Sequence, residues 1–178
     1  AIPGTVVAVG IIIPFAWMDN TLDSFMREQF DISTGLILSG SLFAVLFAYM
    51  VRFLAVSLQT VESGLGKIKP SMDDAARSLG YRPRETLLKV HMPLMKGSLL
   101  TALLIVFVDV MKELPATLIL RPFNFNTLAV RAFELASDER LADSSTAALM
   151  IVLVGLIPVI YLSKSISKSR AGSQSETV

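Results

Sequence analysis

The stretch from Asp73 to Pro93, DDAARSLGYRPRETLLKVHMP, is dense in charged residues. It lies between two long apolar runs, LILSGSLFAVLFAYMV at residues 36–51 and LMKGSLLTALLIVFVDVM at residues 94–111. Apolar runs of roughly 17–25 residues are typical of helices that span a membrane. The sequence therefore predicts a polar, helical loop that joins two membrane spans.

The composition favours an integral membrane protein over a soluble α protein with buried core helices. Of 178 residues, 53% are hydrophobic and 17% are charged, and the mean hydropathy is +0.62. Soluble domains carry about 25% charged residues. The absence of cysteine excludes disulfides, thiolate metal sites and Cys nucleophiles. Because Ala1 lies directly inside an apolar run, we expect the chain to be a piece of a longer protein.

Four spans are predicted, at residues 1–18, 34–56, 93–111 and 144–163. Only helices can cross lipid as separate segments, since lipid cannot hydrogen-bond exposed backbone. The predicted fold class is therefore all-α transmembrane. Small residues that would let neighbouring helices approach closely recur in two of these spans: Gly35, Ser39, Gly40, Ser41, Gly97 and Ser98.

Lysine and arginine are unevenly distributed along the chain. Residues 52–96 and the C-terminal tail together hold eleven of them, whereas the two connections on the opposite side hold five. The positive-inside rule then places the loop 57–92 and the C-terminus in the cytoplasm. We expect one N-terminally truncated transmembrane domain over residues 1–165 and a disordered cytoplasmic tail over residues 166–178.

Two short helices are predicted within the charged loop. Ser71 followed by Asp74 fits a capping pattern, and Gly80 fits a left-handed C-cap, which gives a helix over residues 72–79. Its apolar stripe is Met72, Ala75, Ala76 and Leu79. A helix of two turns is not stable alone. The stripe therefore packs either on the membrane and the protein's own helices or on a soluble partner.

A second helix is predicted to begin at Pro83, with an i,i+4 pair between Glu85 and Lys89. Pro93 marks the bend where the chain returns to the membrane. On the opposite side, Pro115 and Pro122 break any continuous helix. Thr127 is predicted to cap a short helix that runs to about Ala136.

The loop resembles a motif of the membrane subunits of binding-protein-dependent ABC importers. That motif reads E-A-A, three residues, G, nine residues and I-x-L-P. Here Asp74-Ala75-Ala76 is followed by Gly80 and by Val90-His91-Met92-Pro93 at the same spacing. The departures are Asp for Glu at 74, Val for Ile at 90 and Met for Leu at 92.

The resemblance implies that the first short helix is a coupling helix, which sits in a groove of an ATP-hydrolysing subunit. Ala75 and Ala76 would form the close-packed contact, Gly80 the turn and Asp74 the polar anchor. Leu79 and Pro93 complete the predicted coupling residues. The implied fold is a MetI-like permease bundle of five core helices, of which four are present here.

Three further stretches resemble the ferric-iron type of importer permease: residues 1–10, 111–145 and 153–163. In that type two homologous halves are often fused, and this chain resembles the second half. The resemblance implies a multi-pass protein of the bacterial inner membrane that takes up ferric iron. Thiamine, sulfate, phosphonate and polyamines are alternative substrates within the same class.

The implied partners are two ABC ATPase subunits, a solute-binding protein, another permease half and the lipid membrane. No glycine-rich phosphate loop is present, so ATP and Mg²⁺ would bind to the ATPase and the chain itself would be neither an enzyme nor a cofactor protein. No basic and aromatic pattern indicates nucleic acid. A secondary carrier or channel, and a membrane anchor for a cytoplasmic complex, remain as rival classes.

Asp109 and Glu113 are candidates for the translocation path, because ionisable groups within spans usually face a bundle interior or an aqueous path. The alternative is an interfacial ion pair in which Lys112 neutralises Asp109. Their oxygens would suit a hard cation. His91 is the only histidine, and it is expected to be an interfacial residue beside Pro93 and not a metal ligand.

Overall fold

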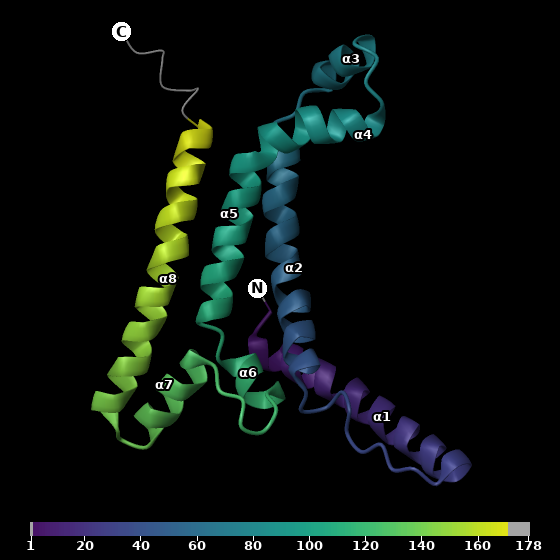
Figure 1. The fold of residues 1–178 in the computed structure, drawn as a ribbon, viewed down its shortest axis with the longest axis vertical. Coiled ribbons are helices and arrows are strands. Elements are labelled where there is room, and N and C mark those ends of the chain that lie inside the picture. Colours follow the sequence, from purple (N-terminus) through teal and green to yellow (C-terminus); the bar gives the residue numbers. More distant parts are fainter. Residues whose placement is uncertain (1, 171–178) are drawn as a thin grey trace. The chain divides into compact units, whose positions relative to one another are not determined.

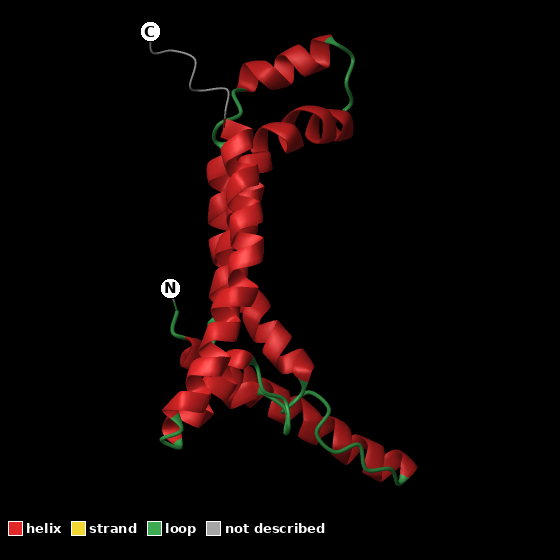
Figure 2. Ribbon diagram, turned by 60° about the vertical axis from the view of Figure 1, so that its left-hand side comes forward, coloured by secondary structure: helices red, strands yellow, loops and turns green. Residues whose placement is uncertain are grey.

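The computed structural model describes residues 2–170, and every regular element in that range is a helix (Figure 2). The all-α prediction is therefore confirmed. In chain order the elements are α1 Gly4–Phe30, α2 Leu42–Leu65, α3 Pro70–Ser78, α4 Pro83–Thr86, the π-helical turn η1 Leu87–His91, α5 Met92–Met111, α6 Pro115–Leu120, α7 Leu128–Ser137 and α8 Leu141–Arg170 (Figure 1).

Four helical segments are long and apolar enough to cross a membrane. They are Gly4–Phe30, Leu42–Leu65, Pro83–Met111 and Leu141–Ser167. Large apolar side chains on all four remain exposed, among them Ile13, Met50, Leu103 and Ile157. Surfaces of this kind match lipid, which agrees with the four predicted spans.

The predicted boundaries of the first two spans are wrong. We expected the first span to end near residue 18 and the second to begin at residue 34, but α1 continues to Phe30 and α2 begins at Leu42. Residues 33–41 run as a non-helical segment, in which Gly35 and Gly40 adopt positive φ. Glycine takes up this left-handed conformation at little cost, so the apolar sequence TGLILSGS does not continue the helix.

Two carboxylates of α1 hold this segment. Asp19 is 1% exposed and accepts hydrogen bonds from the backbone N–H groups of residues 37–39, at 3.1, 2.9 and 2.7 Å. One turn further along, Asp23 accepts from the N–H groups of Thr34 and Gly35, at 2.8 and 3.0 Å. The two carboxylates thus replace the hydrogen bonds that a helix over residues 33–41 would have supplied.

The later spans agree more closely with expectation. α5 covers Met92–Met111, against a prediction of 93–111, and α8 extends the predicted span 144–163 at both ends. The predicted tail boundary at residue 166 lies inside α8, which continues to Arg170. The remainder of that tail, residues 171–178, lies outside the described residues.

The chain divides into two compact units, which we describe separately. The first comprises residues 1–54 and 109–154. Its core is formed by small and branched side chains of α1, α2 and α6, and α6 packs on α1. Ala8, Ala44, Ala48 and Ala116 are almost fully buried, so these backbones lie close together.

The second unit comprises residues 55–108 and the chain from residue 155 onward. In it α2 approaches α5 closely at Gly64. A Cβ atom added to Gly64 would lie 2.8 Å from the Cβ of Ser98 and 3.6 Å from the Cε of Met95. Glycine at 64 and serine at 98 therefore permit a contact that larger side chains would prevent.

We predict that Gly64→Ala lowers the thermal stability of the detergent-purified protein, because overpacking costs about 1–3 kcal/mol. The matched control is Gly10→Ala, where an added Cβ meets nothing within 4 Å. That control should be neutral or slightly stabilising, since alanine is favoured over glycine in helices. Equal unfolding temperatures for the two variants would contradict the close approach at Gly64.

Candidate functional site

The first candidate site is the charged loop, which begins with α3. Pro70 is the first helical residue and Lys69 the N-cap, with no capping hydrogen bond from a side chain. The predicted cap at Ser71 is therefore wrong, because proline is already favourable at the first helical position and the helix starts two residues earlier than predicted. Asp73 lies in the first turn and Arg77 in the last, as the helix dipole favours.

The corner after α3 is closed by backbone hydrogen bonds. The N–H of Gly80 donates to the carbonyl of Arg77 at 2.9 Å, and the N–H of Tyr81 donates to the carbonyl of Ala76 at 3.0 Å. Gly80 has φ +80°, which confirms the predicted left-handed C-cap. This pair of bonds is the Schellman arrangement, in which glycine avoids the steric cost of positive φ.

After the corner, the chain passes through α4 and η1 into α5. Pro83 begins α4, as predicted, and the Glu85–Lys89 pair forms at 3.3 Å. In η1 the N–H of Met92 donates to the carbonyl of Leu87, a five-residue spacing. This π-helical turn directly precedes Pro93, which lacks an N–H for regular helical bonding. Figure 1 shows the change of direction between α4 and α5 at this point.

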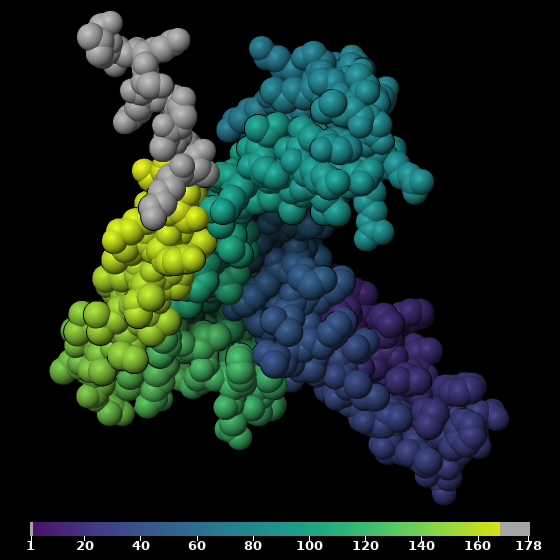
Figure 3. Space-filling model, turned by 45° about the horizontal axis from the view of Figure 1, so that its top comes forward, coloured from purple at the N-terminus to yellow at the C-terminus, as the bar shows by residue number. Residues whose placement is uncertain are grey.

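His91, which was expected to be only an interfacial residue beside Pro93, also contacts α3. Its Nε2 atom is 2.6 Å from Oδ1 of Asp73, so it links η1 to the first turn of α3. Both residues line a hollow of about 220 Å³ between the two helical segments, together with Arg77, Tyr81, Pro83 and Thr86. α3 and α4 lie side by side, and their atoms form one block in the space-filling view, in teal (Figure 3).

The predicted coupling residues lie on two faces of the loop. Ala76 is 2% exposed and packs inside the chain, whereas Asp74, Ala75 and Gly80 are exposed. Leu79 is also exposed, with 74% of its surface open. One side of α3 is thus held by the protein itself, and the other side presents a small apolar surface next to a carboxylate.

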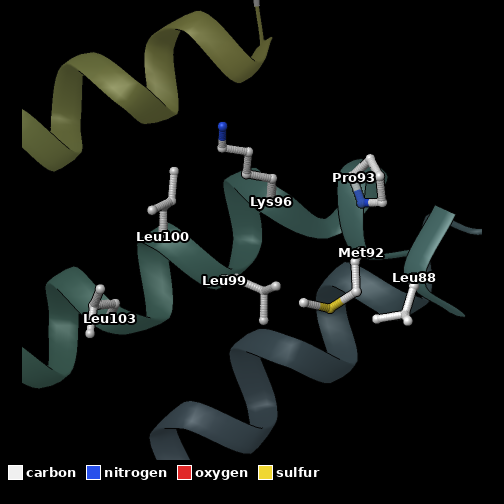
Figure 4. Close-up of a pocket in the computed structure, with 7 residues that line it drawn as sticks. All are labelled: Leu88, Met92, Pro93, Lys96, Leu99, Leu100 and Leu103. Atoms are coloured by element: carbon white, nitrogen blue, oxygen red, sulfur yellow. The ribbon is translucent and has the colours of Figure 1, made fainter. Parts of the chain in front are cut away.

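Pro93 is exposed and lies at the edge of an apolar hollow on η1 and α5, with a volume of about 490 Å³. Figure 4 shows the lining side chains from Leu88 to Leu103, of which Lys96 alone carries a charge. Such an apolar surface suits contact with the hydrocarbon region of a membrane, with the ammonium group of Lys96 near the edge of that region.

The second candidate site is a buried ion pair in the first unit. Glu113 is 4% exposed, and its Oε2 lies 2.6 Å from Nη1 of Arg52 on α2. Its Oε1 accepts the N–H of Ala116 at 3.0 Å, at the start of α6. Nη1 of Arg52 finds no hydrogen bond of suitable angle among the described residues, so charge attraction dominates this contact.

Neighbouring groups extend the pair into a polar cluster. The hydroxyls of Tyr49 and Thr117 lie 2.5 Å apart, and that of Thr117 also donates to the carbonyl of Glu113 at 3.2 Å. Gly4 of α1 lies against the pair, because a Cβ there would collide with the guanidinium of Arg52. The cluster therefore joins α2 to α6 through charged and hydroxyl groups, and α1 packs against it through Gly4.

The two predicted path residues are held in separate pairs. Asp109 lies 3.0 Å from Lys112, as in the interfacial pairing we had considered, whereas Glu113 is neutralised by Arg52. Sequence reasoning missed Arg52, which had been counted with the cytoplasmic loop. Without Arg52 the predicted cytoplasmic side still holds ten Lys and Arg residues against five on the opposite side, so the predicted orientation is unchanged. Within residues 2–170 no three acidic or histidine side chains come together as a metal site.

The opposite connection is ordered by a polar network. Thr127 caps α7 by accepting the N–H of Val130 at 3.3 Å, as predicted. Arg121 lies 2.7 Å from Glu134, and Asn126 donates to the same carboxylate at 2.8 Å. These contacts hold the proline-containing connection between α6 and α7 in a compact conformation.

Residues 1–171 match the family described as the binding-protein-dependent transport system inner membrane component, and the chain belongs to this family. It is a component of membrane transport systems and not an enzyme, as predicted from the sequence. Together with the four apolar helices, the family makes this a multi-pass membrane protein.

Relatives within the family carry different names. The chain is 28% identical over 164 residues to the Fe(3+)-transport system permease protein FbpB 2 of Haemophilus influenzae, covering 92% of this chain and 29% of that protein. It is 30% identical over 164 residues to the putative 2-aminoethylphosphonate transport system permease protein PhnV of Salmonella typhimurium, covering 92% and 56%. The chain thus spans about a third to just over half of these relatives. No solved structure matches it.

We predict that Glu113→Gln destabilises the detergent-purified protein by about 3 kcal/mol or more, because it leaves the charge of Arg52 without its partner. Replacing both partners, as Arg52→Met with Glu113→Gln, should recover part of that loss. Asp109→Asn is the control, since an exposed pair is worth about 1 kcal/mol or less. Thermal unfolding measures all three, and an equal loss for Asp109→Asn and Glu113→Gln would refute the assignment.

Proposed function

We propose that this chain is the membrane-spanning permease part of an ATP-driven importer and that it couples to separate ATPase subunits through residues 71–90. The observation that carries the proposal is the two-faced α3. Ala76 anchors the helix to its own chain, while Asp74, Ala75 and Leu79 stay exposed. A two-turn helix with this division suits insertion into a groove of another protein.

The excess of Lys and Arg supports a cytoplasmic location for this loop and for the C-terminus. Two ATPase copies would bind ATP and Mg²⁺ there, and a solute-binding protein would deliver substrate at the opposite face. Closure of the ATPases on ATP would move α3, and the spans, together with another permease half, would alternate between outward-open and inward-open states. The Asp74-Ala75-Ala76…Gly80…Pro93 motif would mark the docking segment.

We predict that Leu79→Asp lowers the ATP hydrolysis that co-purifies with the complete transporter about tenfold or more, since a charge replaces an apolar contact that is buried on docking. Leu79→Met keeps the apolar contact and should retain the activity. Full hydrolysis by the Leu79→Asp complex would contradict docking through α3. Import that continues when vanadate blocks ATP hydrolysis would indicate a secondary carrier or channel.

We propose ferric iron as the substrate, with 2-aminoethylphosphonate as the second candidate. Iron is supported by the resemblance of residues 111–145 and by the similarity to a protein named as an Fe(3+)-transport permease. The phosphonate is supported by the similarity to PhnV, which extends over a larger share of that relative.

We predict that cells lacking this protein lose uptake of radioactive ferric iron at low concentration and keep growth on 2-aminoethylphosphonate as phosphorus source. The protein restored from a plasmid should return iron uptake, and its Leu79→Asp variant should not. The reverse pattern, with iron uptake intact and phosphonate growth lost, would assign the phosphonate.

A further inference from the structure

We infer that Asp73 and His91 are positioning residues that tie the docking helix α3 directly to the start of the membrane span α5. This inference rests on the proposed function, because it concerns how motion of α3 reaches the membrane. Its starting observation is the 2.6 Å contact between Oδ1 of Asp73 and Nε2 of His91. The contact joins two residues that are 18 positions apart in the sequence.

The contact between Asp73 and His91 attaches the first turn of α3, which the corner at Gly80 does not hold. The corner at Gly80 holds the C-terminal end of α3 through the bonds from Gly80 and Tyr81. Asp73 lies in the first turn, about 7 Å further along the helix axis at 1.5 Å per residue. Without this contact α3 and η1 would be joined only through the glycine corner and α4, whereas the contact makes the first turn of α3 move together with η1.

The contact between Asp73 and His91 connects α3 to the start of α5 without passing through α4. His91 is the last residue of η1, and α5 begins at the next residue, Met92. A displacement of α3 that passes through His91 therefore reaches the span directly. Through the covalent path it would have to cross the corner, α4 and the π-helical turn, and π-turns and proline positions are where helices bend.

The surroundings favour a strong contact. The side chain of His91 is 19% exposed and that of Asp73 is 40% exposed, so water competes only partly. A hydrogen bond to an ionised carboxylate is roughly twice as strong as one between neutral groups. Buried Thr86 and half-buried Tyr81 form part of the wall of the same hollow, which keeps both partners within reach.

The test measures the number of iron ions imported per ATP hydrolysed by the complete transporter in proteoliposomes, with radioactive ferric iron on its binding protein. We expect His91→Ala and Asp73→Ala to keep the ATPase subunits bound and hydrolysing. Imported iron per ATP should fall about three- to tenfold, the population change produced by one lost hydrogen bond.

Two matched variants separate a tie from a general effect on the loop. His91→Gln can place an N–H at the position of Nε2, and it should keep a ratio close to that of the wild type. Glu62→Gln makes a carboxylate-to-amide change at an exposed acid of α2, outside residues 71–90, and it should leave the ratio unchanged.

A cross-link keeps the proposal testable if the alanine variants fold poorly. These 178 residues contain no cysteine, so Asp73→Cys with His91→Cys introduces a single cysteine pair into them. Bridging that pair with a short bifunctional thiol reagent should restore the ratio that the unbridged double variant loses.

Three results would overturn the tie: a wild-type ratio in both alanine variants, an equal fall in His91→Gln and His91→Ala, or loss of the ATPase subunits from the alanine variants. The last result would mean that the pair shapes the docking surface instead of transmitting its movement. Failure of the wild type to import iron at all would refute the proposed substrate and would be seen before any variant is compared.

Discussion

The structure depends on the requirement that a backbone surrounded by apolar material satisfy its own hydrogen bonds. Where the chain is helical this happens within each helix. Where it is not, side chains accept these bonds: Asp23 accepts the N–H groups of residues 34 and 35, Asp19 accepts those of residues 37–39, and Glu113 accepts that of Ala116. These three acidic residues near the ends of the spans therefore accept hydrogen bonds from backbone N–H groups that no helical carbonyl satisfies.

The same requirement shapes the docking loop. At its corner the N–H groups of Gly80 and Tyr81 satisfy the carbonyls of Arg77 and Ala76, and Leu79 beside the corner is exposed. Ala76 packs one face of α3 on its own chain, and the face with exposed Leu79 is the one that we propose docks on an ATPase subunit. α3 is too short to be stable alone. Packing of Ala76 against its own chain stabilises it, while its opposite side remains exposed.

Features set by neighbouring residues could be predicted from the sequence. The span of α5, the left-handed Gly80, the start of α4 at Pro83 and the cap at Thr127 depend on contacts within a few positions. Features set by distant contacts could not. Nothing near TGLILSGS indicates that Asp19 will capture its N–H groups, and nothing near Arg52 indicates that Glu113 will be its partner. Periodicity reports which residues are apolar, but not which remote polar groups will meet.

The neutral pair of Arg52 and Glu113 has a consequence for energetics. One elementary charge carried across a membrane held at 100 mV changes the free energy by about 2.3 kcal/mol. A guanidinium and a carboxylate held 2.6 Å apart shift together with almost no net charge. The pair itself would therefore add almost no voltage dependence to a rearrangement of α1, α2 and α6 that keeps it intact, in energised and de-energised cells alike.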